Sequence, residues 1–207
     1  MQSLPGGHIR FIGVPLSFII MPAYQVWDFQ ISGGPDWIRT EPWDIVAEAE
    51  GVQGFLTIDR QRPMLRALME DRFRLKVHNE TKLIPGYALV VDKNGPKLHR
   101  NTDANLLIQN GKGSLIAKKE GMTWLVGWLS QKLGSAVIDN TGLSGEFDFN
   151  LEWTPDLGEN SAVGPTPTGD GPSIFTALAE QLGLRLVAQR VPADVIVIDS
   201  AQRPSPN

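Results

Sequence analysis

Four polar side chains alternate with apolar ones in the segment 146–153. The polar residues are Glu146, Asp148, Asn150 and Glu152, and the apolar residues are Phe147, Phe149, Leu151 and Trp153. Successive side chains of a strand point to opposite faces, so the polar residues would share one face at a spacing of about 6.5–7 Å. Carboxylates at that spacing suit an inverting glycosidase or a hard cation such as calcium. The alternation is equally typical of an antiparallel strand with one buried and one solvated face, and both interpretations stay open.

The second candidate is the polar segment His78-Asn-Glu80-Thr-Lys82. On a strand, His78, Glu80 and Lys82 share one face. A histidine and a glutamate at this spacing can ligate zinc, or can act as a general base with its orienting carboxylate. The chain has 3 histidines, and neither His8 nor His99 forms a spaced pair with His78. A cross-strand salt bridge or simple exposure is the structural alternative, and we predict no metal site.

Other chemical motifs fail on spacing or residue type. The chain has no cysteine, which excludes disulfides and thiolate chemistry. The segment Gly142-Leu-Ser-Gly145 lacks the spacing of a serine nucleophile elbow, and Ser32-Gly-Gly-Pro35 has no phosphate-loop helix after it. We therefore predict no cofactor. Trp37, in a turn, is the best candidate for an exposed ring that stacks on a sugar or anchors a partner, with burial over the sheet as the alternative.

Composition narrows the possible partners. Hydrophobic residues make up 42% of the chain, charged residues 20%, and the formal net charge is −4. This balance is ordinary for a globular domain and lacks the basic footprint of a nucleic-acid-binding protein. The longest apolar stretch, Val14–Tyr24, is broken by Pro15 and Pro22 and is too short for a transmembrane segment. It also lacks the features of a signal peptide.

The elements that must position these residues follow a repeated pattern. Leu65, Leu68, Met69 and Phe73 match Ile174, Ala177, Leu178 and Leu182, and the two sets lie 109 residues apart (174 − 65). Each set precedes a short alternating strand, then a proline and an apolar run ending in aspartate, Pro85–Asp92 and Pro192–Asp199. Such a period indicates a duplicated architecture.

Two halves follow from this period, each with the order strand-helix-strand-strand-helix-strand-strand. We predict an α+β fold with mainly antiparallel sheets and helices packed on one face. The first repeat spans 1–98, a connecting segment 99–113 and the second repeat 114–207, with a loop at 156–172 that we expect to be mobile. His78 aligns with Val187, and Glu146 with Pro42, so neither candidate site is duplicated.

Six phrases of the chain carry a family resemblance. They are Gln30–Trp37, Asp71–His78, Tyr87–Asp92, Asp139–Gly145, Phe149–Pro155 and Gly171–Leu178. Together they resemble a soil-associated bacterial family of uncharacterised proteins, known chiefly as a domain of unknown function. Members are often exported or lipid-anchored, so the resemblance implies an extracytoplasmic location, periplasmic or secreted. Because the family's N-terminal export signal and first strand are not in this sequence, we expect a mature or trimmed form.

A looser resemblance, in pattern only, links each helix-strand-strand unit to the short N-terminal domains of secretins and TonB-dependent receptors. Those modules are periplasmic docking units, although fold analogy does not establish function. We predict a non-enzymatic binding or docking module whose ligand is a partner protein or an envelope component. It would bind through a sheet edge or the groove between the halves. The alternative is a hydrolase, a glycosidase or esterase, that uses Glu146, Asp148 and Glu152 or the His78/Glu80 pair; a structural segment of a larger sensor is a third interpretation.

Overall fold

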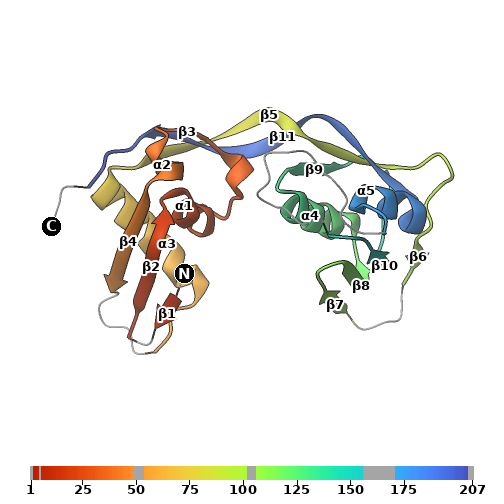
Figure 1. The fold of residues 1–207 in the computed structure, drawn as a ribbon, viewed down its shortest axis with the longest axis horizontal. Coiled ribbons are helices and arrows are strands. Elements are labelled where there is room, and N and C mark those ends of the chain that lie inside the picture. Colours follow the sequence, from red (N-terminus) through yellow and green to blue (C-terminus); the bar gives the residue numbers. More distant parts are fainter. Residues whose placement is uncertain (1, 5, 49–53, 102–105, 156–170, 205–207) are drawn as a thin grey trace. The chain divides into compact units, whose positions relative to one another are not determined.

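The computed structural model describes residues 2–4, 6–48, 54–101, 106–155 and 171–204. Contacts divide the chain into two compact units (Figure 1). Unit 1 comprises residues 1–83 and 192–207, and unit 2 comprises residues 84–191. Unit 1 thus takes its last segment from the end of the chain. The repeats 1–98 and 114–207, joined by 99–113, stay a prediction. The expected loop at 156–172 lies almost wholly outside the described residues.

Unit 1 is built on a three-stranded antiparallel sheet in the order β1-β2-β4. Its elements are β1 (Gln2–Leu4), β2 (His8–Pro15), α1 (Ser17–Tyr24), a 3₁₀ turn η1 (Asp28–Gln30), β3 (Ile31–Gly33), α2 (Trp37–Thr40), β4 (Pro42–Glu48) and α3 (Ile58–Phe73). Alternate residues of β2, Ile9 and Phe11, are buried in one core with α1 and α3. The helices therefore cover a single face of this sheet, as predicted.

Unit 2 is built on a four-stranded antiparallel sheet in the order β6-β10-β8-β7. Its elements are β6 (His99–Arg100), β7 (Leu107–Asn110), β8 (Ser114–Glu120), α4 (Met122–Leu133), β9 (Ala136–Asp139), β10 (Phe147–Glu152), α5 (Ile174–Ala177) and a π-helical turn η2 (Leu178–Leu182). Phe147, Phe149 and Leu151 of β10 are buried in the core, which also contains residues of α4 and η2. The α+β class and the mainly antiparallel sheets are confirmed.

Each expected pair of final strands is one long strand instead. β5 runs from Lys76 to Val91, and β11 runs from Leu184 to Ser200, without a turn. The sequence suggested a break at Pro85 and Pro192. Proline fixes φ near −65°, which an extended backbone accepts, so a proline alone does not impose a turn.

The far end of each long strand belongs to the unit built on the other half of the sequence. In unit 2, β5 pairs in parallel with β9 through Gly86–Leu89. In unit 1, β11 pairs in parallel with β3 through Ile196–Ile198. The strand order of this third sheet is β3-β11-β5-β9. The two halves of the sequence therefore contribute their last strands reciprocally.

Most of the positions that match in the sequence are buried in both units; Leu68 is half-buried, while its counterpart Ala177 is buried. Leu65, Met69 and Phe73 of α3 are at most 2% exposed. Ile174, Leu178 and Leu182 of α5 and η2 are at most 6% exposed. Each of these helical segments ends at a residue in the left-handed conformation, Arg74 and Gly183. The internal duplication stays an inference. A duplicated architecture would produce these matching buried positions and helix ends.

Both sheets also contain the same irregularity. The register between β2 and β4 shifts beside Gly13, whose φ is +61°, and the Gly13 N–H donates to Asp44 Oδ1 at 2.8 Å. The register between β8 and β10 shifts beside Lys119, whose φ is +62°, and the Lys119 N–H donates to Asp148 Oδ1 at 3.2 Å. In each bulge an aspartate satisfies the backbone group that the shifted ladder leaves without a strand partner.

Gly86 lies where β5 approaches β9 closely in unit 2. A Cβ atom at Gly86 would lie 2.4 Å from the Ala136 carbonyl oxygen and 2.6 Å from Val191 Cγ2. We expect Gly86→Ala to lower the free energy of unfolding by about 1–3 kcal/mol, because the backbone must move apart. Urea titration measures this. Gly127→Ala, where a Cβ meets nothing within 4 Å in helix α4, is the control and should stabilise by about 0.5–1 kcal/mol. Equal stability of Gly86→Ala and wild type would contradict the tight pairing.

Candidate functional site

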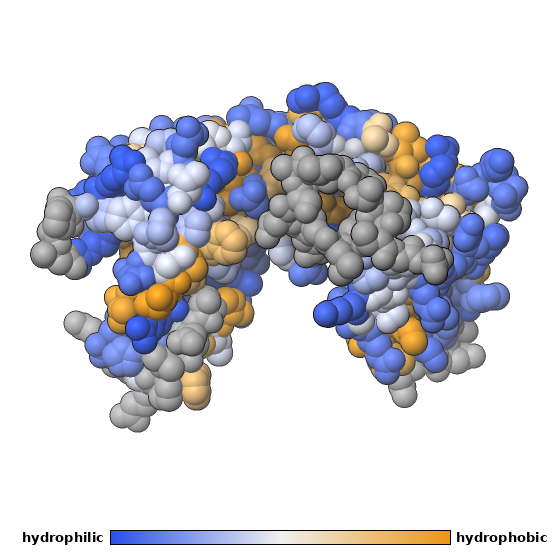
Figure 2. Space-filling view, viewed as in Figure 1, coloured by the Kyte–Doolittle hydropathy of each residue, from blue (hydrophilic) through white to orange (hydrophobic). Residues whose placement is uncertain are grey.

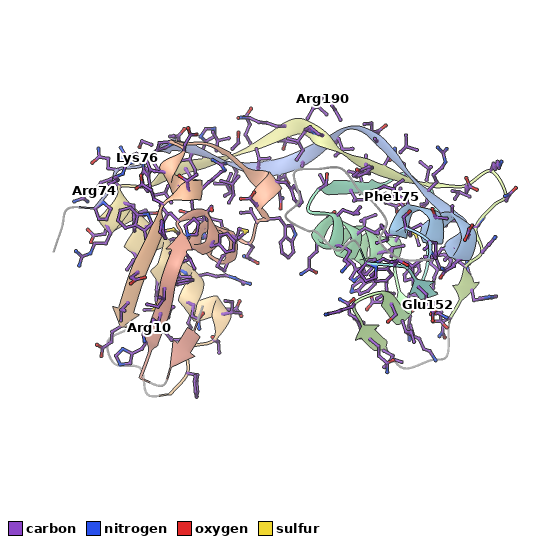
Figure 3. All side chains as sticks on the ribbon, in the orientation of Figure 1. Arg10, Arg74, Lys76, Glu152, Phe175 and Arg190 are labelled. Atoms are coloured by element: carbon purple, nitrogen blue, oxygen red, sulfur yellow. The ribbon has the colours of Figure 1, made fainter. Side chains whose placement is uncertain are left out.

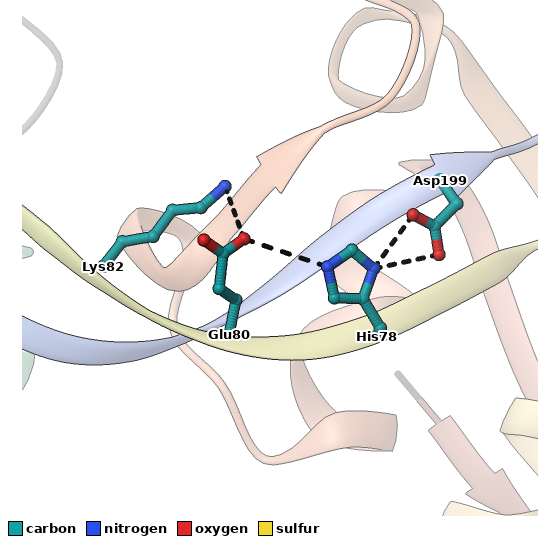
Figure 4. Close-up of polar contacts among 4 residues, drawn as sticks. All are labelled: His78, Glu80, Lys82 and Asp199. Carbon is teal, nitrogen blue, oxygen red and sulfur yellow. Dashed lines mark hydrogen bonds and ion pairs between the residues drawn. The ribbon is translucent and has the colours of Figure 1, made fainter.

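A polar cluster in unit 1 joins β5 to β11 (Figure 4). His78 Nδ1 lies 2.9 Å and 3.1 Å from the two carboxylate oxygens of Asp199. His78 Nε2 lies 3.8 Å from Glu80 Oε2, and Lys82 Nζ lies 3.1 Å from the same oxygen. The imidazole therefore has a carboxylate near each nitrogen, and these contacts orient the ring.

The cluster is a surface feature. About half of each acidic or imidazole side chain is exposed: 51% for His78 and 47% for both Glu80 and Asp199. Water screens ion pairs at such exposure, so each pair contributes little to stability. The sequence brought His78, Glu80 and Lys82 together but missed Asp199, which lies 121 residues away. The aspartate that ends each apolar run was a conspicuous residue in the sequence. Its contact with His78, however, depends on the register between β5 and β11, which the sequence does not show.

The corresponding aspartate of unit 2 also has a basic side chain as its partner. Asp92 ends the apolar run of β5, and its Oδ1 lies 3.6 Å from Arg185 Nε of β11. Asp199 and Asp92 thus play similar parts as cross-strand partners. His78 and Glu80 have no such counterpart, because Val187 aligns with His78. The distinctive groups of this cluster are therefore the imidazole and Glu80.

The acidic segment at β10 has one buried and one solvated face, as the alternation predicts. Asp148 accepts hydrogen bonds from Asn101 Nδ2 at 2.7 Å and 3.0 Å and from the Lys119 N–H. Glu146 and Glu152 are exposed; Glu152 lies at the end of β10 (Figure 3). Because Asp44 makes the same bulge contact in unit 1, we interpret Asp148 as a structural residue.

Trp37 is buried, with 7% of its surface exposed. Its ring packs against Trp43 and Phe73, with centroids 6.0 Å and 6.2 Å away. Arg203 lies over the ring at 5.3 Å and also forms an ion pair with Glu41, just before β4. The hydrogen bond that Arg203 donates to Glu41 within this ion pair lowers the pKa of the Glu41 carboxyl below its ordinary value. Burial is the alternative that the sequence left open, so we do not propose Trp37 as a ligand contact.

An open sheet edge is the feature that the sequence did not locate. Within the described residues, β4 ends the strand order of its sheet, whereas the corresponding strand β10 has β6 beyond it. The inward-facing residues of β4, Trp43, Ile45 and Ala47, are only half-buried, while those of β10 are buried. Hydrophobic residues also surface over β2 and β4 (Figure 2), where Ile12 is 50% and Val46 68% exposed.

A small hollow lies between the end of β4 and α3. Its volume is about 100 Å³, and it is lined by Gly7, Ile9, Ala47, Glu48, Met64, Leu65 and Leu68. The lining is mainly apolar, with one carboxylate at its border. A space of this size accepts one aliphatic side chain but not a small-molecule substrate, since ligand pockets usually exceed about 300 Å³.

In unit 2 the chain covers the corresponding edge with its own residues. Arg100 and His99 of β6 pair with Phe147 and Asp148 of β10. The Arg100 guanidinium lies 6.0 Å from the centre of the Phe147 ring. The next residue, Asn101, donates its backbone N–H to the Glu146 carbonyl and its side-chain amide to Asp148. A short basic segment thus extends this sheet.

Among the described residues, no three His, Asp or Glu side chains form a group that could hold a metal ion. No helix in that part of the chain is long and apolar enough to cross a membrane. The family described as "Protein of unknown function (DUF3738)" matches residues 17–201. The chain belongs to this family. No curated protein and no solved structure matches it.

Membership in DUF3738 confirms the resemblance to a domain family of unknown function. The matched region contains the His78 cluster, the open edge of β4 and the strand β10. The soil association and the looser similarity to secretin and TonB-receptor domains stay predictions.

Removing the Asp148 carboxylate tests its structural role. We expect Asp148→Ala to lower the free energy of unfolding by about 1–3 kcal/mol, because the Lys119 N–H and the Asn101 amide lose their acceptor. Urea unfolding, with Glu146→Gln and Glu152→Gln as controls that stay within about 0.5 kcal/mol of wild type, measures this. A neutral Asp148→Ala variant would reopen a functional role for this carboxylate.

Proposed function

We propose that this chain is a non-enzymatic docking module that binds an extended segment of a partner protein along the edge of β4. The observation that carries this proposal is the edge of β4, along which no strand of the described part of the chain pairs and whose inward residues stay half-buried. A strand added at a sheet edge gains main-chain hydrogen bonds, and alternate side chains supply specificity. The hollow beside Ala47 and Leu68 gives one such side chain a place to bind.

The covered edge of unit 2 suggests what the partner segment looks like. There β6 supplies an arginine over an aromatic ring, and the next residue, Asn101, supplies an amide to the bulge aspartate. Trp43 and Asp44 of β4 correspond to Phe147 and Asp148, and within the described residues no strand pairs beyond them. A basic, extended segment would reproduce these contacts in unit 1.

Charge favours the same partner. The charged residues of β4 are Asp44 and Glu48, both exposed and both acidic. Arg10, the nearest cation on β2, lies opposite Val46 and one strand further from the edge. An acidic edge attracts basic residues and repels acidic ones, which supplies selectivity more than affinity. We propose an extracytoplasmic setting for this interaction, on the family resemblance alone.

Short peptides test the proposal directly. A peptide that alternates leucine and arginine should bind with a Kd of about 10–100 µM by fluorescence polarisation, and one that alternates leucine and glutamate should not. Glu48→Lys should reverse this preference, because it inverts the charge at the hollow.

The matched control is Glu152→Lys, at the corresponding position of β10, which should leave peptide binding unchanged. Docking at β4 would be contradicted if the basic peptide does not bind, or if Glu48→Lys and Glu152→Lys weaken its binding equally.

A hydrolase is the second candidate, and the His78–Asp199 pair is the observation in its favour. An imidazole oriented by a carboxylate is the general-base part of many hydrolytic sites. Against it stand the exposure of the pair and its position outside the hollow between β4 and α3.

We expect wild-type protein to show no turnover of chromogenic ester and glycoside substrates above buffer. A rate that disappears in His78→Ala, while the variant keeps the wild-type unfolding midpoint, would replace the docking proposal with catalysis. His8→Ala is the control for a nonspecific imidazole effect.

A further inference from the structure

Strand β7 of unit 2 forms a second open edge, with a different character. Among the residues that the structure describes, it ends the strand order β6-β10-β8-β7, and all four of its residues are exposed. Leu106, Leu107 and Ile108 are 65%, 38% and 46% exposed, a continuous apolar run. Natural edge strands usually carry a charge or a proline that discourages pairing. β7, with the sequence Leu-Ile-Gln-Asn, has neither.

The hairpin register determines which backbone groups face outward. The Gly111 N–H bonds to the Ser114 carbonyl, and Ile108 lies opposite Ala117 on β8. Hydrogen-bonded and non-hydrogen-bonded pairs alternate along an antiparallel ladder. Ile108 and Asn110 therefore direct their N–H and C=O groups away from β8. The ladder can continue from these two residues.

A hollow also lies beside β7, on the face of the sheet that α4 covers. A hollow of about 240 Å³ is lined by Asn110 of β7 and by Trp128, Gln131 and Lys132 of α4. Ile108 shares the face of its partner Ala117, which is buried, yet remains 46% exposed. A further strand would shield the Ile108 side chain and continue the sheet beside this hollow.

We infer that two copies of this chain pair antiparallel through β7. Such pairing about a two-fold axis places Ile108 opposite Ile108 of the second copy, on the same face of a continuous sheet. We choose a second copy as the occupant on the basis of charge. β7 has no charged side chain, so two copies present no like charges to each other at this edge. The edge of β4 differs, because Asp44 and Glu48 would meet the same carboxylates of a second copy.

The size of the strand sets the strength of the dimer. A contact of four residues per copy buries much less than the roughly 1,200 Å² of a standard stable interface. The dimer is therefore weak and dependent on concentration, with a Kd of about 0.1–1 mM. This inference does not depend on the proposed binding of a basic segment to β4.

Sedimentation equilibrium over a range of concentrations tests the inference. The weight-average mass of wild-type protein should rise from 22.7 kDa toward twice that value. Ile108→Lys should weaken association by about tenfold or more, because two lysines would lie opposite each other. Phe18→Lys, at an apolar residue of α1 that is 57% exposed, is the matched control and should associate as wild type does.

Two results would overturn the inference: a wild-type mass that stays at 22.7 kDa up to about 1 mM, or association that Ile108→Lys leaves unchanged. Amide hydrogen exchange gives a second readout, in which Ile108 exchanges more slowly at high concentration. Glu48→Lys should dimerise normally, which separates this result from the docking test. A near-ultraviolet spectrum identical to wild type shows that Ile108→Lys is folded.

Discussion

The shared use of β5 and β11 is the constraint on which the rest of the structure depends. Each strand begins in the unit built on its own half of the sequence and ends in the other unit, beside β9 or β3. Neither unit is complete without the end of the other half's strand. Gly86 allows β5 to lie close to β9, and the contacts of His78 with Asp199 and of Arg185 with Asp92 follow from the pairing of the two strands.

The two units are similar enough that their differences carry information about function. Both have an antiparallel sheet, a bulge held by an aspartate, and a helical segment with the same buried positions. We interpret the carboxylate that occurs in both bulges as a structural group, while a catalytic role of Asp148 stays an untested prediction. The two sheets differ at one edge. In unit 2, β6 pairs beyond β10, whereas in unit 1 β4 is the last strand among the described residues. We base the proposed docking function on that difference.

The sequence predicted what depends on local periodicity. Leu65, Met69 and Phe73 indicated the buried face of α3, and the alternation after Glu146 indicated the two faces of β10; both are confirmed. Pairing between distant strands has no such local signal, so Asp199 was missed as the partner of His78. The two separate strands expected around Pro85, and likewise around Pro192, are one long strand each, because proline is compatible with extended backbone. An open edge is likewise defined by what lies beside a strand, which one sequence does not encode locally.

The docking proposed for this member of a family of unknown function takes place at the edge of β4. Hydrogen exchange of the backbone amides, with and without a peptide that alternates leucine and arginine, tests it most directly. We predict slower exchange for the segment Trp43–Glu48, because its outward N–H groups gain partners, and no change in β10. Unchanged exchange in β4 at saturating peptide, or protection confined to β10 or the His78 cluster, would contradict the account.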